Sequence, residues 1–436
     1  MMNEIVLTEH QSEILYQSLD VLSRSNRLLI TGKAGTGKST LMKFLLRELK
    51  RKEREDKRRY SSDLKSVCSA PTNKAVKVLK EKIGEEFGKY NDFKTTHSAL
   101  RLQRYINERN GTVEFKPDKY GEKPLQGVNI LIVDEASMLN TELLKYIEEY
   151  SERIKVIFIG DEAQLPPVGE PVSPVFTAGY PKVELTEIIR QGEGNPIIDL
   201  SRDFSLIKSR KDNRKNIGGY IFSNDTDKVI ETLAAINGTD DLKYLAWTNK
   251  EVDYINSQVR RRIYGNPKKV EIGESLIFNT PYDKFFTNEE ITVITLEVVE
   301  RNLCIYKIIN PEHNAENIDQ PEFLERYEKL KMYIVNREIP IIHEDSEKLF
   351  KEICKDLSLK AKAGLLRWED FYNFMEGYAD IKYNHAITVH KSQGSSYNQV
   401  IINMRDLSYN KDINEYNKLL YTAITRAKEL VILYKV

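Results

Sequence analysis

The sequence has few of the features that mark secreted, metal-bound or membrane proteins. Its three cysteines, Cys68, Cys304 and Cys354, are far apart, and no histidine accompanies them at metal-binding spacing. This pattern indicates neither a disulfide framework nor a zinc site. No apolar run approaches the roughly 20 residues of a membrane span, and no basic segment followed by an apolar one opens the chain. We expect a cytoplasmic protein with no membrane partner, in the host cytoplasm if a phage encodes it.

The chain also lacks an excess of charge of either sign. Lys plus Arg and Asp plus Glu each total 66, so the formal net charge is zero. This balance excludes a strongly basic protein that coats nucleic acid, and any nucleic-acid binding must be local. Apolar residues at 40% and charged residues at 30% are typical of a globular protein. The length allows about two to four domains.

Apolar runs alternate with helix-like stretches along the first half of the chain. We expect buried parallel strands at 27–31, 66–70, 128–133 and 155–159. The alternation predicts a doubly wound α/β sheet, which binds ligands at the carboxyl ends of its strands. A similar signal at 241–246, 385–388, 399–403 and 430–434 predicts a second α/β domain.

Several stretches depart from this alternation. The mixed-charge run 50–59 is expected to be a solvated loop. Residues 104–116 carry Asn110-Gly111 between two β-prone stretches, which predicts a hairpin because both residues tolerate a positive φ. Residues 272–309 are rich in Val, Ile, Thr and Phe and predict a small antiparallel barrel or sheet. Residues 310–376 are charged and helix-like, and no role is assigned to them.

The strongest motif is Gly-Lys-Ala-Gly-Thr-Gly-Lys-Ser at 32–39, which fits the Walker A pattern between an expected strand and helix. Backbone N–H groups of such a loop surround phosphates, while Lys38 reaches the β- and γ-phosphates and Ser39 binds Mg²⁺. The expected nucleotide contacts are Gly32, Gly35, Thr36, Gly37, Lys38, Ser39 and Thr40.

A second motif, Leu-Ile-Val-Asp-Glu at 131–135, places two adjacent carboxylates at the end of an apolar strand. Asp134 would serve the metal and Glu135 the attacking water. On its own, an apolar strand followed by Asp-Glu is more often a capped strand end with no catalytic role. Together with a Walker A loop, however, it predicts hydrolysis of a nucleoside triphosphate. After the next strand, Gln164 in segment 160–167 has an amide that could sense the γ-phosphate.

The ordered set of motifs resembles superfamily 1 helicases of the 1B branch, the RecD-like and Dda-type group, over nearly the whole chain. The matching segments are residue 11 and residues 32–39, 70–75, 95–98, 134–137, 160–167, 185–190, 246–249, 388–394 and 420–428. The resemblance implies an α/β protein with two RecA-like P-loop domains, an inserted β-hairpin and an inserted SH3-like subdomain. The implied bounds are 1–200 for the first domain, 101–124 for its hairpin, 201–271 with 377–436 for the second domain, and 272–376 for the SH3-like insertion.

The same resemblance implies roles around the nucleotide. Gln11 would read the adenine edge and favour ATP over GTP, although an isolated glutamine there would more often be a surface amide. Arg190 and Arg426 would be arginine fingers from different domains, which suits a transition state that gathers negative charge. Either arginine alone would more often form a surface ion pair. Gln393 and Gly394 would join the nucleotide cleft to the DNA track.

The implied DNA track crosses both domains and consists mostly of short polar side chains, which suit sequence-independent contacts to sugar and phosphate. Its residues are Pro71, Thr72, Asn73, Thr95 and His97 in the first domain, and Thr248, Asn249, Thr388, His390, Lys391 and Ser392 in the second. An isolated histidine is otherwise more often a packing residue. In the hairpin, Tyr105 and Phe115 are either wedge aromatics or core residues.

We therefore expect ATP- and Mg²⁺-dependent 5′ to 3′ translocation on single-stranded DNA with unwinding of forked duplex DNA. The polarity follows from the resemblance alone. We expect a monomer that acts with replication or recombination proteins, and a minimal motor, because the Walker A loop begins only about thirty residues into the chain. The alternatives are a translocase that displaces proteins without extensive unwinding, a P-loop phosphotransferase and an ATP-gated loading protein.

Overall fold

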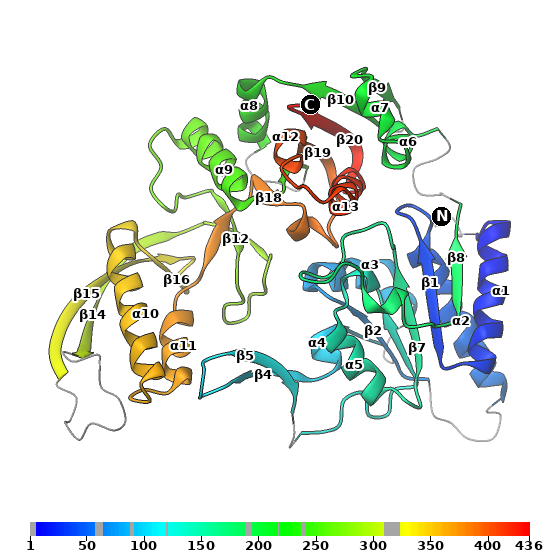
Figure 1. The fold of residues 1–436 in the computed structure, drawn as a ribbon, viewed down its shortest axis with the longest axis horizontal. Coiled ribbons are helices and arrows are strands. Elements are labelled where there is room, and N and C mark those ends of the chain that lie inside the picture. Colours follow the sequence, from blue (N-terminus) through cyan, green and yellow to red (C-terminus); the bar gives the residue numbers. More distant parts are fainter. Residues whose placement is uncertain are drawn as a thin grey trace.

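The computed structural model describes residues 6–56, 64–87, 91–118, 121–187, 194–216, 218–236, 241–308 and 323–436. Figure 1 shows two α/β bodies, an inserted region beside the second body, and a hairpin that extends from the first body toward the inserted region. Among the described helices, none combines the length and apolarity required to cross a membrane.

The first body is built on a six-stranded parallel sheet, in the order β3-β2-β6-β7-β1-β8. Strands β2 and β6 are buried along their whole length, as in parallel sheets covered on both faces. One core cluster joins the sheet to α1, α2 and α3, and a second joins its other face to α5. The strands are β1 (Arg27–Gly32), β2 (Ser66–Ala70), β3 (Asn91–Thr95), β6 (Ile130–Val133), β7 (Lys155–Gly160) and β8 (Lys182–Leu185). The helices are α1 (Glu9–Arg24), α2 (Lys38–Asp56), α3 (Asn73–Phe87), α4 (Thr96–Ala99) and α5 (Thr141–Tyr150).

The charged run that begins at Lys50 is helical where the structure describes it, so the expected solvated loop is wrong for residues 50–56. Helix α2 continues to Asp56. Arg51 pairs with Glu48 at 2.9 Å and with Glu55 at 2.7 Å, one helical turn to either side. Opposite charges at this spacing stabilise an exposed helix. Residues 57–59 lie outside the described residues.

The second body contains a six-stranded sheet in the order β18-β11-β19-β20-β10-β9, so the predicted second α/β domain is confirmed. All neighbouring strands are parallel except the edge pair β9 and β10. The strands are β9 (Asn213–Lys215), β10 (Gly218–Ser223), β11 (Leu242–Ala246), β18 (Ala386–Thr388), β19 (Tyr397–Asn403) and β20 (Ala427–Tyr434). The helices are α6 (Pro196–Arg202), α7 (Ser205–Lys208), α8 (Thr226–Ile236), α9 (Asn249–Tyr264), α12 (Met404–Leu407) and α13 (Ile413–Ile424).

Helix α6 belongs to this second body, although the sequence placed the boundary between the domains at residue 200. Ile197 and Leu200 are buried in the core cluster that contains Leu419 and Leu420 of α13. The apolar face of α6 is therefore covered by the second sheet and α13, and the expected boundary falls inside a helix.

The inserted region lies in the chain between α9 and β18 and contains two small antiparallel sheets, in the orders β13-β12-β17 and β14-β15-β16. Their strands are β12 (Ser275–Phe278), β13 (Glu290–Thr292), β14 (Leu296–Ile308), β15 (Phe323–Val335), β16 (Ile339–Ile342) and β17 (Ile381–Tyr383). Helices α10 (Glu347–Lys362) and α11 (Trp368–Glu376) follow β16. Phe350 stacks on Phe374 with ring centroids 5.6 Å apart and joins the two helices.

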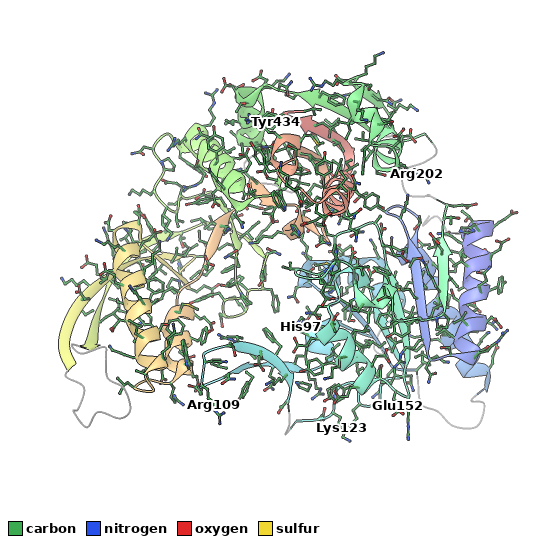
Figure 2. The ribbon with its side chains drawn as sticks, viewed as in Figure 1. His97, Arg109, Lys123, Glu152, Arg202 and Tyr434 are labelled. Atoms are coloured by element: carbon green, nitrogen blue, oxygen red, sulfur yellow. The ribbon has the colours of Figure 1, made fainter. Side chains whose placement is uncertain are left out.

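The predicted hairpin is present as β4 (Leu102–Ile106) and β5 (Val113–Pro117), with Arg104 opposite Phe115. Gly111 has a φ of +72°, a conformation that favours glycine, and its N–H donates to Asn107 O at 2.7 Å. Figure 2 shows His97 near the base of the hairpin and Arg109 near its far end.

Candidate nucleotide cleft and DNA track

The Walker A loop connects the carboxyl end of β1 to the first turn of α2. Gly35 and Gly37 have φ values of +85° and +81°, which only glycine adopts without strain. A Cβ atom on Gly32 would lie 2.7 Å from Thr36 Oγ1. Lys38 Nζ donates to Gly32 O at 2.5 Å and Lys33 O at 3.1 Å, so its charge lies within the curl of the loop. A loop of this form at a helix N-terminus binds phosphate groups.

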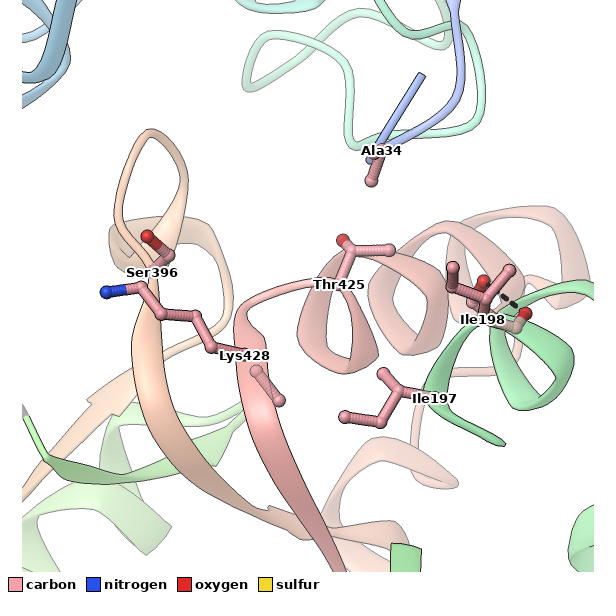
Figure 3. Close-up of a pocket in the computed structure, with 9 residues that line it drawn as sticks. Ala34, Ile197, Ile198, Ser396, Thr425 and Lys428 are labelled. Carbon is pink, nitrogen blue, oxygen red and sulfur yellow. Dashed lines mark hydrogen bonds between the residues drawn. The ribbon is translucent and has the colours of Figure 1, made fainter. Parts of the chain in front are cut away.

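A cleft of about 320 Å³ lies over this loop and is lined by both α/β domains. It unites most residues of the predicted nucleotide site. From the first domain come Gln11, Gly35, Thr36, Gly37, Lys38, Ser39, Thr40, Asp134, Glu135 and Gln164, and from the second come Gly394, Ser395, Ser396, Thr425 and Arg426. Figure 3 shows a smaller pocket that shares Ala34, Ser396 and Thr425 with this cleft. In it Ala34 lies opposite Thr425, with Ser396 and Lys428 to one side and Ile197 and Ile198 of α6 to the other.

The two carboxylates at the end of β6 differ in their surroundings. Burial, followed by the negative charge of the adjacent Glu135, raises the pKa of Asp134 to about 6, and the positive charge of Lys38 opposes this rise. Asp134 Oδ1 accepts the N–H of Glu135 at 3.0 Å. Glu135 itself has a φ of +53°, a conformation that is costly for a residue with a side chain and that concentrates at functional sites.

The half-buried Asp134 and the hydroxyl-bearing Ser39 both line the cleft, and their oxygens fit a divalent cation that also binds phosphate oxygens. Mg²⁺ is usually held in this way, by one or two protein oxygens with water and phosphate. The described residues contain no cluster of three or more His, Cys, Asp or Glu side chains that could hold a metal ion by themselves.

Gln164 lies in the loop after β7, and its side chain faces the cleft. The residue is 5% exposed, and its Oε1 has no hydrogen-bond partner among the described residues. Buried amide oxygens nearly always have a partner. The arrangement therefore leaves a buried acceptor at the wall of the cleft without a donor from the part of the chain that the structure describes.

The other predicted nucleotide contacts are held by neighbours. Gln11 is buried rather than a surface amide, and its Nε2 donates to Thr36 O at 3.4 Å. Arg426 is also buried, with Nη1 donating to Ser395 O at 3.0 Å and Nε donating to Thr422 O at 3.1 Å. The guanidinium is thus held at the cleft wall by its own domain, and it forms no ion pair with the residues that the structure describes. Arg190 lies outside the described residues.

Several predicted DNA contacts also cap helices at the ends of strands. Thr72 Oγ1 accepts Ala75 N after β2, and Thr95 Oγ1 accepts Ser98 N after β3, both at 3.2 Å. Thr248 follows β11, where its hydroxyl donates to Asp406 Oδ1 at 2.7 Å. Parallel strands present their carboxyl ends at one edge of a sheet, so these polar residues lie along such an edge in each domain.

The remaining predicted DNA contacts differ in accessibility. Pro71, Asn73, His390 and Lys391 are partly buried, and Asn249 is exposed. Burial lowers the pKa of His97 and His390, which favours neutral rings, and His97 also meets the Phe115 ring edge-on at 5.4 Å. Thr388 is 7% exposed and Ser392 is 0% exposed. The Ser392 hydroxyl donates to Val389 O at 2.7 Å, so this structure does not bring Ser392 to a surface that DNA could reach.

The contacts between the domains include two residues, Tyr421 and Thr422, for which the motifs indicated no individual role. Tyr421 Oη accepts the N–H of Ala34 at 2.9 Å, and Thr422 Oγ1 accepts that of Leu165 at 3.3 Å. Gln393 Nε2 donates to Leu165 O at 3.0 Å. Tyr421 and Thr422 lie within the matching segment 420–428, but that motif does not indicate which of its residues reach the first domain.

The two sheets define a P-loop ATPase fold in which both domains line the cleft over the Walker A loop. Residues 6–212 match the family described as an AAA domain, and residues 383–434 match the UvrD-like helicase C-terminal domain. The chain is 28% identical over 443 residues to the ATP-dependent DNA helicase dda of Enterobacteria phage T4, with 94% of each chain covered. It is 26% identical over 455 residues to the RecBCD subunit RecD of Buchnera aphidicola subsp. Schizaphis graminum, with 93% of this chain and 69% of that protein covered.

The solved structures agree on the fold. The structure described as the basis for DNA unwinding at forked duplex DNA by two coordinating Pif1 helicases has a TM-score of 0.50 and 18% identity, and the match covers 98% of this chain and 92% of that one. The chain is thus similar over most of its length to the DNA helicase Dda and to the RecBCD subunit RecD. It is an ATP-dependent DNA helicase with two RecA-like domains, as the motifs predicted.

Proposed function

We propose that this helicase moves 5′ to 3′ along single-stranded DNA and separates the strands of a forked duplex with the β4–β5 hairpin. The polarity rests on the resemblance of the motifs to the 1B branch. The observation that carries strand separation is the hairpin itself, a two-stranded arm that leaves the first domain and is fastened at its far end to α11 of the inserted region. A fastened arm can withstand the force of DNA drawn against it.

The fastening uses both polar and ring contacts. The Glu108 carboxylate accepts a hydrogen bond from the backbone N–H of Trp368 at 2.7 Å, and Tyr372 Oη donates to Gly111 O at 2.7 Å. The Arg104 guanidinium lies 4.6 Å from the centre of the Tyr372 ring and pairs with Glu376. Isolated two-stranded hairpins are marginally stable in water, so these contacts keep the arm formed.

The hairpin also presents apolar side chains to solvent. Tyr105 is 52% exposed and Phe115 is 44% exposed, which rules out the alternative that they are core residues. An exposed aromatic ring can stack on a base, and stacking is largely independent of sequence. Phe115 is the better candidate for the wedge, because its ring already contacts His97 at the expected DNA track.

The proposed domain organisation follows from these contacts. The first RecA-like domain comprises the described residues before α6 and carries the hairpin within 101–124. The second comprises residues 196–271 and 386–436. The SH3-like subdomain comprises residues 272–385 and does not end at 376 as expected, because β17 pairs with β12 of the inserted region. Single-stranded DNA would cross the sheet edges that carry Thr72, Thr95 and Thr248, together with the other predicted track residues except the buried Ser392.

The proposed chemistry assigns one task to each group in the cleft. Lys38 and the loop N–H groups bind the phosphates, and Mg²⁺ held by Ser39 and Asp134 would neutralise phosphate charge. Glu135 accepts a proton from the attacking water, and Gln164 orients that water through Oε1. Gln11 binds the adenine edge, while Arg426 and Arg190 stabilise the transferred phosphoryl group.

Paired DNA substrates test the proposal. Each carries the same duplex with a single-stranded tail at either its 5′ or its 3′ end, and unwinding is followed under single-turnover conditions. Strand separation confined to the 5′-tailed substrate supports the proposal, and separation confined to the 3′ tail contradicts it. Displacement of streptavidin from a biotinylated single strand, with neither duplex unwound, would instead support the protein-displacing translocase.

A further inference from the structure

The loop of residues 161–165, which carries Gln164, is held by three side chains of the second domain. Tyr421 Oη donates to Asp161 Oδ2 at 2.7 Å and accepts the N–H of Ala34 in the Walker A loop at 2.9 Å. At the other end of the 161–165 loop, Leu165 N donates to Thr422 Oγ1 and Leu165 O accepts from Gln393 Nε2. One tyrosine hydroxyl therefore joins the Walker A loop, the 161–165 loop and helix α13.

These contacts are shielded from water. Asp161 is 2% exposed, Tyr421 4% and Thr422 0%. Burial, followed by the negative charge of Asp161, raises the pKa of Tyr421 far above its usual range, so the hydroxyl keeps its proton and remains a donor. Hydrogen bonds to a buried carboxylate are stronger than neutral ones, and loss of the donor leaves the charge without a partner.

Asp161 transmits the position of Tyr421 to Gln164. Its Oδ2 accepts from Tyr421, while its Oδ1 accepts the N–H of Ala163 at 3.0 Å. The Asp161 backbone carbonyl accepts the N–H of Gln164 at 3.1 Å. The carboxylate thus links the tyrosine to the turn that sets the direction of the Gln164 side chain.

Helix α13 also holds the arginine of the second domain. Arg426 Nε donates to Thr422 O, and Thr422 is the neighbour of Tyr421. Movement of the end of α13 toward the first domain therefore displaces both Tyr421, the partner of Asp161, and Thr422, the partner of Arg426.

We propose that Tyr421 is a positioning residue that couples closure of the two domains to the placement of Gln164. When the second domain approaches, its hydroxyl fixes Asp161 and the Walker A loop together, and Gln164 then faces the water that attacks the γ-phosphate. The proposal rests on the role proposed above for Gln164. It assigns Tyr421 no direct contact with the nucleotide.

Tyr421→Phe tests this proposal, because it removes the hydroxyl and keeps the ring. ATP hydrolysis is measured at saturating single-stranded DNA. We expect kcat to fall about tenfold, with KM for ATP within about twofold of wild type, because a positioning defect acts on the transition state. Tyr416→Phe is the matched control: Tyr416 lies on the same helix, is half-buried, and has no side-chain hydrogen bond among the described residues. Its kcat should not change.

Analogue binding separates positioning from general damage. Tyr421→Phe should bind ADP with aluminium fluoride, which resembles the transition state, about tenfold more weakly, and a non-hydrolysable ATP analogue as tightly as wild type does. Equal weakening of both, or an unchanged kcat, would overturn the proposal. If Tyr421→Phe does not fold, Thr422→Val removes the Leu165 contact from the same helix and should lower kcat in the same direction.

Gln164→Ala distinguishes the proposed water-orienting role of Gln164 from the proposed positioning role of Tyr421. If this variant keeps the wild-type kcat, the role of Gln164 fails and the proposal for Tyr421 fails with it. If Gln164→Ala is impaired while Tyr421→Phe is not, the water-orienting role stands and only the inference about Tyr421 is wrong.

Discussion

Gly394 of the second domain approaches Ala75 of the first so closely that a Cβ atom on Gly394 would lie 3.2 Å from the Cβ of Ala75. The same atom would lie 3.3 Å from Thr72 Oγ1, and Gly394 has a φ of +73°. Ala75 lines the nucleotide cleft, while Thr72 belongs to the expected DNA track. The close approach therefore joins the two sites at a point where a side chain would hold the domains apart.

Gly394→Ala should weaken the coupling between DNA and ATP hydrolysis. The added methyl group opposes closure of the domains, so we expect the stimulation of ATPase activity by single-stranded DNA to fall severalfold, and stability to fall by about 1 kcal/mol from backbone strain. Gly273→Ala is the control, since Gly273 has a φ of +83° but nothing within 4 Å of an added Cβ. Equal losses of stimulation in both variants would attribute the effect to strain rather than to the domain contact.

Lys38→Ala should lower ATP turnover by at least about a hundredfold and leave thermal stability nearly unchanged. The Lys38 ammonium contacts only loop carbonyls in the described structure, and no core packing depends on it. Lys33→Ala is a matched control in the same loop, because Lys33 is exposed and has no proposed role. Steady-state hydrolysis and a thermal melt measure both effects. Hydrolysis that survives in Lys38→Ala would refute the assignment of the phosphate site.

Local patterns in the sequence predicted the parts of the site that local chemistry determines. The Walker A loop requires a positive φ at Gly35 and Gly37, which favours glycine. The glycines in the motif therefore predicted the backbone conformation of the loop. The apolar runs in both halves of the chain predicted the strands of the two sheets, because strands that are buried on both faces of a sheet are apolar along their length. The helical extension to Asp56 was also readable, since Arg51 lies three and four residues from its acidic partners.

Contacts between distant residues could not be predicted in the same way. Tyr421 and Ala34 are 387 positions apart, and Glu108 and Trp368 are 260 apart. Each contact depends on how complete domains meet, and one sequence contains no periodicity or spacing that encodes it. The same limit explains why α6 was assigned to the first domain: its apolar face indicates burial but not the sheet that covers it.

The pKa of Asp134 predicts a stability that depends on pH. Burial raises this pKa to about 6 from its usual value near 3.8, so the folded protein binds the proton more tightly than the unfolded chain does. The stabilising contribution of the protonated group is complete below the unfolded pKa and is lost as pH rises through about 6. Asp134→Asn should therefore raise the melting temperature of the nucleotide-free protein at pH 7.5 more than at pH 4.5, and abolish ATP turnover. Equal shifts at both pH values would contradict the raised pKa.

The fastening of the hairpin predicts that unwinding can be lost separately from ATP hydrolysis. Glu108→Ala removes the carboxylate that accepts the backbone N–H groups of Trp368 and Glu369, so the arm should yield when duplex DNA is drawn against it. We expect the single-turnover unwinding rate on a forked duplex to fall about tenfold, the effect of roughly 1.4 kcal/mol on the barrier. The DNA-stimulated ATPase rate should remain within about twofold, since no residue of the arm lines the nucleotide cleft.

Two comparisons make this test specific. Arg109→Ala changes an exposed residue near the same end of the hairpin, whose side chain has no hydrogen bond or ion pair among the described residues, and it should unwind at the wild-type rate. Deletion of the whole hairpin should abolish unwinding and preserve DNA-stimulated hydrolysis. If the deletion removes both activities, the hairpin supports the fold of the first domain, and its role in separating strands is wrong. If Glu108→Ala unwinds normally while the deletion does not, the hairpin separates strands without needing its anchor on α11.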